Sequence, residues 1–249
     1  MCTRRRITCG VVRLALIASV ASPLSGQVAQ PKAPRIDVLF IGNSYTYYND
    51  LPGMLRAMAA ASHDSIDVNA ASVVEGGASL RTHWNRRTID LIRNGDWDYV
   101  VLQEQSLAPL EARDEFMAYG MRFARQIRAA KAKPVLYLTW SRQQRPADQS
   151  RLNEAYGALA RETDAIIVPV GPVWQELREL EGVPGLYADD GSHPSSFGSF
   201  VAAATFYRTI FGETLPEQGW LAHGVQRRAI RVVQRAVEGA VQSSSRAAR

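Results

Sequence analysis

Cysteine and histidine are scarce in this chain, which limits the chemistry available to it. The two cysteines, Cys2 and Cys9, both fall within the first nine residues, and there are four histidines in 249 residues. No His-x-x-x-His pair and no set of cysteines with zinc-ligand spacing is present. The sequence therefore predicts no metal site. After removal of the N-terminal segment it also predicts no disulfide, so the hydrophobic core must hold the fold.

Three further patterns are missing. No Gly-x-Gly-x-x-Gly segment follows an expected strand, which argues against a dinucleotide site, and we expect no cofactor. Beyond residue 27 no apolar run has the length of a membrane-spanning helix. The first 27 residues contain four arginines and no acidic residue, so their removal lowers the net charge from +5 to about +1. Only scattered arginines remain, which argues against nucleic-acid binding, since that needs a basic face on the folded domain.

The N-terminal segment has the features of a secretory signal peptide. Arg4, Arg5 and Arg6 precede an apolar run over residues 11–21, and small and turn-forming residues follow at 22–26. We expect a signal peptide over 1–27, a linker over 28–35, one domain over 36–242 and a disordered tail over 243–249. The mature chain is expected to be secreted or periplasmic, without stable insertion in a membrane. The pattern does not indicate an oligomeric state.

Beyond residue 35 the apolar pattern alternates between strands and helices. Strands are expected at 36–41, 66–72, 99–103, 135–139 and 165–170. Helices are expected at 51–61, 80–93, 111–131, 152–162, 195–211 and 225–241, with a short helix after the fifth strand. Strands separated by helices predict an α/β fold with a parallel sheet that is covered on both faces.

Polar and small residues follow these strands at the edge where a parallel sheet meets its ligands. Gly42-Asn43-Ser44 follows the first strand, Gly76-Gly77 the second, and Gln103-Glu104-Gln105 the third. Near the end of the domain stands Asp190-Gly191-Ser192-His193. We therefore expect these four segments to lie together.

This set of residue types suits acyl transfer. A serine hydroxyl is a weak nucleophile, so attack by Ser44 needs a base such as His193 within hydrogen-bond reach. A carboxylate such as Asp190 fixes the tautomer of the imidazole and stabilises its charged form. A developing oxyanion needs fixed donors. Candidates are the backbone N–H groups of Ser44 and of Gly77 or Gly76, with an amide from Gln105 or Gln103.

The four blocks, in this order, resemble the SGNH (GDSL-like) hydrolase superfamily over residues 36 to about 211. The resemblance implies a flavodoxin-like three-layer α/β/α fold with a five-stranded parallel sheet, and a metal-independent esterase. It implies Ser44 as nucleophile, Gly77 as oxyanion donor, and Asp190 and His193 as the acid and base.

Two features depart from the superfamily pattern. Asn43 stands where many members have aspartate, and the third block reads Leu-Gln-Glu-Gln-Ser instead of Gly-x-Asn-Asp. A glutamine can supply the missing amide donor on a longer arm. By register we prefer Gln105 and keep Gln103 as the alternative.

Each candidate also has a structural interpretation. Ser44 could cap a helix, and His193 could belong to a turn. Gly76-Gly77 could be no more than the turn that leads into a helix. Glu104 would be a buried charge that needs a partner, so we interpret it as support for the site. Asn43, Tyr45 and Trp140 are predicted to contact substrate.

The predicted function is a serine esterase that forms an acyl-enzyme on Ser44. Its expected substrates are small-molecule or glycan esters, with short O-acyl groups on carbohydrates preferred. Two alternatives remain: an acyltransferase with the same residues, and a non-catalytic module that binds a ligand at the same loops.

Overall fold

The computed structural model describes residues 35–62, 66–216 and 226–247. The expected signal peptide and most of the linker lie outside the described residues. Two of the four histidines, His63 and His223, also lie outside them. The described part forms one compact unit. No helix in this part combines the length and the apolarity that crossing a membrane requires.

The centre of the unit is a parallel sheet of five strands in the order β2-β1-β3-β4-β5. The strands are β1 (Arg35–Gly42), β2 (Asp67–Val74), β3 (Tyr99–Leu102), β4 (Lys133–Tyr137) and β5 (Ile166–Val168). All four strand pairings are parallel. The predicted five-stranded sheet is confirmed, and its order is that of flavodoxin-like folds.

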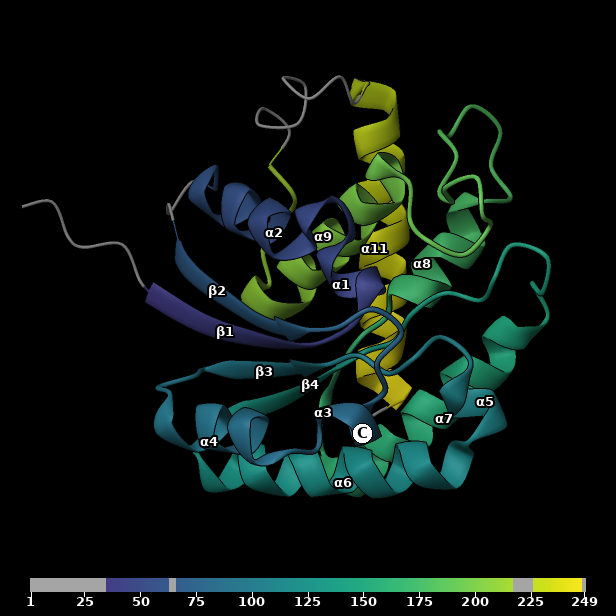
Figure 1. Cartoon of the computed structure of the whole chain (residues 1–249). Coiled ribbons are helices and arrows are strands. Elements are labelled where there is room, and N and C mark those ends of the chain that lie inside the picture. The colour runs from purple at the N-terminus through teal and green to yellow at the C-terminus, as the bar shows by residue number, and fades with distance from the viewer. Residues whose placement is uncertain (1–34, 63–65, 217–225, 248–249) are drawn as a thin grey trace, which may run out of the picture. The chain divides into compact units, whose positions relative to one another are not determined.

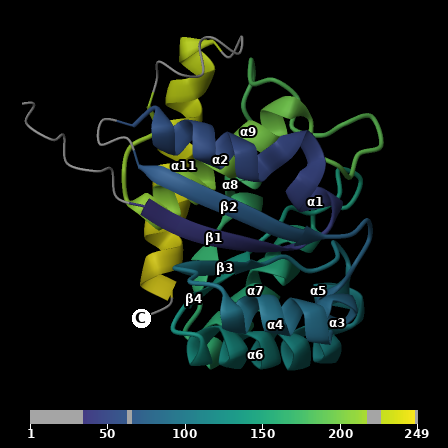
Figure 2. The ribbon, with the colours of Figure 1, turned by 60° about the vertical axis from the view of Figure 1, so that its left-hand side comes forward.

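Helices cover both faces of the sheet (Figures 1 and 2). One face carries α2 (Leu51–Ala60), α8 (Val170–Leu177), α9 (Ser196–Phe211) and α11 (Arg227–Ala247). The other carries α3 (Leu80–His83), α4 (Arg86–Asn94), α6 (Arg113–Ala129) and α7 (Asp148–Thr163). Short helices α1 (Ser44–Tyr47), η1 (Tyr48–Asp50) and α5 (Ala108–Glu111) follow β1 and β3.

The continuous apolar run of β1 is explained by burial on both faces. Val38 and Phe40 pack into the core beneath α2 and α9, whereas Leu39 and Ile41 pack into the core beneath α6 and α7. All four side chains are fully buried. Because side chains alternate along a strand, β1 fixes both helical layers relative to one sheet.

Two segments differ from the predicted elements. Residues 80–93, expected as one helix, form α3 and α4, because the Asn85 side chain accepts a hydrogen bond from the N–H of Thr88 and starts a second helix there. The tail expected from residue 243 instead continues α11 to Ala247. The Ser243 and Ser245 hydroxyls donate to carbonyls four residues earlier, which a helical backbone permits.

Candidate active site

The turn after β1 presents Ser44. The Asn43 side chain accepts a hydrogen bond from the N–H of Tyr45 at 3.1 Å, so that α1 begins at Ser44. Beneath this turn, the buried His83 ring contacts the carbonyl of Gly42 at 2.7 Å through Nε2. Burial lowers the pKa of His83, which therefore stays neutral and donates to that carbonyl. The end of β1 is thus held from the α3 side.

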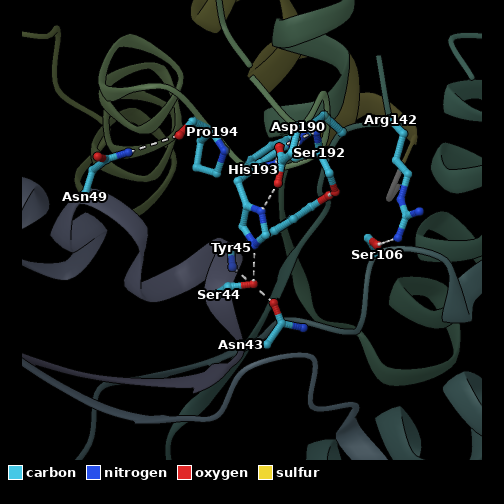
Figure 3. A network of polar contacts seen from close by, with 11 residues as sticks. Asn43, Ser44, Tyr45, Asn49, Ser106, Arg142, Asp190, Ser192, His193 and Pro194 are labelled. Carbon is cyan, nitrogen blue, oxygen red and sulfur yellow. Dashed lines mark hydrogen bonds and ion pairs between the residues drawn. The ribbon is translucent and has the colours of Figure 1, made fainter. Parts of the chain in front are cut away.

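Ser44, His193 and Asp190 form one hydrogen-bonded chain (Figure 3). The distance from His193 Nε2 to Ser44 Oγ is 2.9 Å, and that from His193 Nδ1 to Asp190 Oδ2 is 2.5 Å. The two ends of the domain sequence therefore meet at one point, since 149 positions separate Ser44 from His193. This is the arrangement of a nucleophile, a base and an orienting carboxylate.

The loop that carries Asp190 and His193 closes on itself. The N–H of Ala188 donates to the carbonyl of His193 at 2.8 Å. Gly191 has a φ of +65°, which glycine adopts without strain. Asp190 Oδ1 accepts the backbone N–H groups of Ser192 and His193, each at 2.9 Å. One carboxylate therefore shapes the loop with one oxygen and orients the imidazole with the other.

These contacts keep Asp190 ionised. The hydrogen bond from His193 is the largest cause, followed by the two backbone N–H groups, and together they lower the pKa of Asp190 to about 2. The ionised carboxylate accepts a hydrogen bond from the Nδ1–H of His193. The other ring nitrogen, Nε2, then faces Ser44 as an acceptor.

Two aromatic rings surround the imidazole. The ring of Tyr48 stacks on His193 with centroids 4.7 Å apart, and Tyr45 meets it edge-on at 5.8 Å. The next residue, Asn49, donates through Nδ2 to the carbonyl of Pro194 at 3.1 Å (Figure 3). The segment after Ser44 is thus fastened directly to the residue after His193.

The turn that provides this link is strained. Asn49 and Asp50 both have a φ of +53°, a left-handed conformation that asparagine and aspartate tolerate better than most residues. Strain of this kind persists where the surrounding contacts fix the backbone. Sequence reasoning missed Asn49, although an Asn-Asp pair at the end of a short helix is a signal for such a turn.

The backbone N–H groups of Ser44 and Gly77 donate to no acceptor within the described residues. Gly77 has a φ of +71°, and a Cβ added there would contact no atom within 4 Å. The backbone is therefore open to an approaching group at that point. These two N–H groups follow the first two strands, where the sequence places the oxyanion donors.

Comparisons with solved structures indicate the family to which this fold belongs. A protein from Slackia heliotrinireducens assigned to the SGNH hydrolases is 29% identical, with a TM-score of 0.62, over 71% of this chain and 99% of that one. The chain belongs to the SGNH hydrolase superfamily. The family and the general class, a hydrolase of ester bonds, are those that the sequence predicts, and both are confirmed.

Two other solved structures share the fold of this SGNH hydrolase. A DUF4886 family protein from Bacteroides uniformis is 19% identical, with a TM-score of 0.72, over 84% of this chain and 95% of that one. Axe2, an acetylxylan esterase from Geobacillus stearothermophilus, is 16% identical, with a TM-score of 0.60, over 72% and 96%. No family model and no curated protein matches the sequence.

In this SGNH hydrolase the two candidate amides that follow β3, Gln103 and Gln105, have different hydrogen-bond partners. Gln103 is fully buried. Its Oε1 accepts from the N–H of Asn43 at 2.7 Å and from Thr46 Oγ1 at 3.1 Å, and its Nε2 donates to the carbonyl of Glu104 at 2.5 Å. The structure therefore argues against the alternative prediction that Gln103 donates to the oxyanion. Both ends of its amide bind groups of the protein, and its oxygen stabilises the turn that presents Ser44.

Gln105 keeps a donor available. Its Oε1 accepts the N–H groups of Leu107 and Ala108, at 2.8 and 3.0 Å, where α5 begins. Its Nε2 has no acceptor within the described residues. A fixed amide with a free N–H is what an oxyanion site needs in place of the usual asparagine.

Glu104 lies between these amides and has only backbone partners in the described part of the chain. The side chain is 2% exposed, and Oε1 accepts from the N–H of Leu80 at 3.1 Å and of Gln105 at 2.7 Å. Burial raises the pKa of Glu104 to about 7. The carboxyl joins the start of α3 to the third block, which agrees with its interpretation as support for the site.

The three residues predicted to contact substrate have another role. Asn43, Tyr45 and Trp140 are 3%, 4% and 1% exposed. Tyr45 stacks on Trp140 with centroids 4.6 Å apart, and Trp140 stacks on Trp174 at 3.8 Å. The prediction that these three side chains contact substrate is wrong, because they are packed inside the protein.

The buried stack supports the loop of His193 from below. The Tyr45 hydroxyl contacts Ser192 Oγ at 2.7 Å, and Trp140 Nε1 donates to the carbonyl of Ser192 at 3.0 Å. The tyrosines that remain open beside the site are Tyr47 and Tyr48, which are 45% and 40% exposed. Within the described residues no group of His, Cys, Asp and Glu is placed to hold a metal ion.

Proposed function

We propose that this SGNH hydrolase is a serine esterase that forms an acyl-enzyme on Ser44. The observation that carries the proposal is the 2.9 Å contact between Ser44 Oγ and His193 Nε2, with Asp190 bound to the other ring nitrogen. A hydroxyl so placed loses its proton to the imidazole as it attacks an ester carbonyl.

The steps follow from the positions of these groups. Ser44 Oγ bonds to the ester carbon while His193 takes the hydroxyl proton, and the carbonyl oxygen becomes an oxyanion. The N–H groups of Ser44 and Gly77 and the Nε2 of Gln105 are the donors that we assign to it. The bond between the former carbonyl carbon and the alcohol oxygen then breaks, and His193 gives its proton to the leaving alcohol. Water then attacks the acyl carbon while His193 takes one of its protons, and His193 returns a proton to Ser44 Oγ as the acyl–oxygen bond breaks and the acid leaves.

The substrates that we propose are short O-acyl esters, acetyl above all, carried by carbohydrates. Tyr47 and Tyr48 are half-exposed beside Ser44, and aromatic rings are suited to packing against the apolar face of a sugar. The similarity to an acetylxylan esterase points in the same direction. An acyltransferase would use the same residues and pass the acyl group to a sugar hydroxyl instead of water.

The proposal is tested by hydrolysis of a panel of acetyl, butyryl and octanoyl esters and of acetylated oligosaccharides. Wild-type protein should release acetate fastest. Ser44→Ala should abolish release, whereas Ser150→Ala, a change of a serine exposed on α7, should retain it. Retained hydrolysis in Ser44→Ala contradicts the assignment, and acetylated sugar products in place of acetate would indicate a transferase.

We further propose that the chain is exported and cleaved near Gly26 or Gln27, which leaves residues 28–35 as a linker. The arginines and the apolar run at the N-terminus support this. The intact mass of the protein recovered from the periplasm or medium tests it, since an uncleaved N-terminus would contradict it.

A further inference from the structure

Arg142 follows β4 at the edge of the sheet where Ser44 lies, and within the described residues it has no acidic partner. Its Nη2 donates to Ser106 Oγ at 3.3 Å, and its Nε is buried with no acceptor among the described residues. No ion pair is found for it in that part of the chain. By contrast Arg145, three residues later, pairs with Asp148 at 2.6 Å and Glu111 at 3.4 Å.

Residues on both sides of Arg142 bind the loop that carries His193. Before it, Trp140 Nε1 donates to the carbonyl of Ser192 at 3.0 Å, and after it, the N–H of Gln143 donates to the carbonyl of Gly191 at 2.9 Å. The position of Arg142 is therefore fixed relative to His193. Figure 3 shows Arg142 and Ser106 on the side of His193 opposite to Asn49.

The charge of Arg142 reaches the residue that follows Ser44. Burial is the largest influence on the pKa of the Tyr45 hydroxyl and raises it, while hydrogen bonds from Ser192 and Ser106 and the charge of Arg142 lower it. This influence agrees with the position near the His193 loop that the contacts of Trp140 and Gln143 give to Arg142.

A partly buried guanidinium with one long hydrogen bond and no acidic partner among the described residues is suited to binding an anion. Its Nε is already removed from water, and one long hydrogen bond to a hydroxyl is a weak anchor for a positive charge. The planar fork of arginine matches a carboxylate, and partial desolvation strengthens that attraction relative to a fully hydrated side chain.

We propose that Arg142 binds a carboxylate of the substrate, so that the preferred esters are O-acyl groups on acidic sugars, such as uronic acids. The inference rests on the proposed esterase function and specifies its alcohol portion. A purely structural role, in which Arg142 only holds Ser106, would affect charged and neutral substrates alike.

The test compares two matched substrates: an O-acetylated methyl uronoside and its neutral uronamide. Wild-type protein should favour the carboxylate in kcat/KM by about 10- to 100-fold, mainly through KM, as expected for a charge-assisted hydrogen bond. Arg142→Met should bring the ratio close to one, and Arg142→Lys should leave an intermediate ratio. Arg145→Met should keep the wild-type ratio, because that arginine is already paired.

Other results would overturn the inference. Equal kcat/KM values for the two substrates in wild-type protein, or a proportional loss of both in Arg142→Met, would remove it and leave the esterase function intact. Absence of hydrolysis of any ester by wild-type protein would remove both. If Arg142→Met does not fold, the salt dependence of wild-type protein decides. The preference must shrink in 0.5 M salt by roughly the screening expected for a partly exposed pair, and a salt-independent preference contradicts the inference.

Discussion

Replacement of Glu104 by glutamine should change how the stability of the protein depends on pH. The carboxyl is 2% exposed and accepts two backbone N–H groups through one oxygen, Oε1. A glutamine carbonyl can accept the same two bonds without carrying a charge. The variant therefore removes the ionisation of Glu104 and retains its contacts with Leu80 and Gln105.

The magnitude follows from the pKa. Burial raises the pKa of Glu104 from an ordinary 4.5 to about 7. Ionisation then costs the folded protein about 3 kcal/mol more than the unfolded chain, at about 1.4 kcal/mol for each tenfold change. Between pH 4.5 and 7 the folded state keeps a proton that the unfolded state has released. This contribution to stability is present below pH 4.5 and is lost as the pH rises through 7.

The assay is urea unfolding of wild-type protein and Glu104→Gln at pH 4.5, 6, 7 and 8. We expect similar free energies of unfolding at pH 4.5 and a difference in favour of Glu104→Gln that grows to about 3 kcal/mol by pH 8. Other ionisable groups cancel in the difference. Glu154→Gln, on the exposed surface of α7, is the control and should show no such growth. Parallel curves for wild type and Glu104→Gln would refute the reasoning.

Three further predictions concern the site. Gln105→Leu should lower kcat by about 10²- to 10³-fold with little change in KM, as for loss of an oxyanion donor; steady-state kinetics check this, and an unchanged kcat excludes Gln105 from the hole. Asn49→Ala removes the bond to the Pro194 carbonyl and places alanine at a φ of +53°. It should lower the free energy of unfolding by about 1–3 kcal/mol and should also lower kcat. If urea unfolding shows the loss of stability but kcat is unchanged, the turn stabilises the fold and does not position the site. Because the pKa of Asp190 is about 2, Asp190→Asn should depress kcat by up to about 10⁴-fold at every pH from 5 to 9. A loss confined to acidic pH would disagree.

The sheet could be predicted because its strands carry simple signals. β1 is buried on both faces and reads as an unbroken apolar run, and helical segments separate it from the later strands. The break between α3 and α4 is less visible. It depends on capping by Asn85 and on Trp84, which packs edge-on against Phe123 with centroids 5.0 Å apart. That contact joins segments distant in sequence.

The site divides in the same way. The segments that contain Ser44, Asp190 and His193 can be found from their residue types, and the structure brings these three side chains together. The roles of Gln103 and Gln105 depend on the exact end of β3, at Leu102, and on which amide reaches the Asn43 turn. The burial of Tyr45 and Trp140 depends on a stack with Trp174 from another helix. A local sequence pattern cannot predict this burial, because the stack joins three rings from distant parts of the chain.

The covalent adduct formed with a fluorophosphonate probe tests the central claim most directly, because only an activated hydroxyl reacts readily. The account predicts a single adduct that peptide mass spectrometry locates on Ser44, with labelling that is lost in Ser44→Ala and strongly slowed in His193→Ala. An adduct on Ser192 or Ser106, or no adduct on folded wild-type protein, would contradict it.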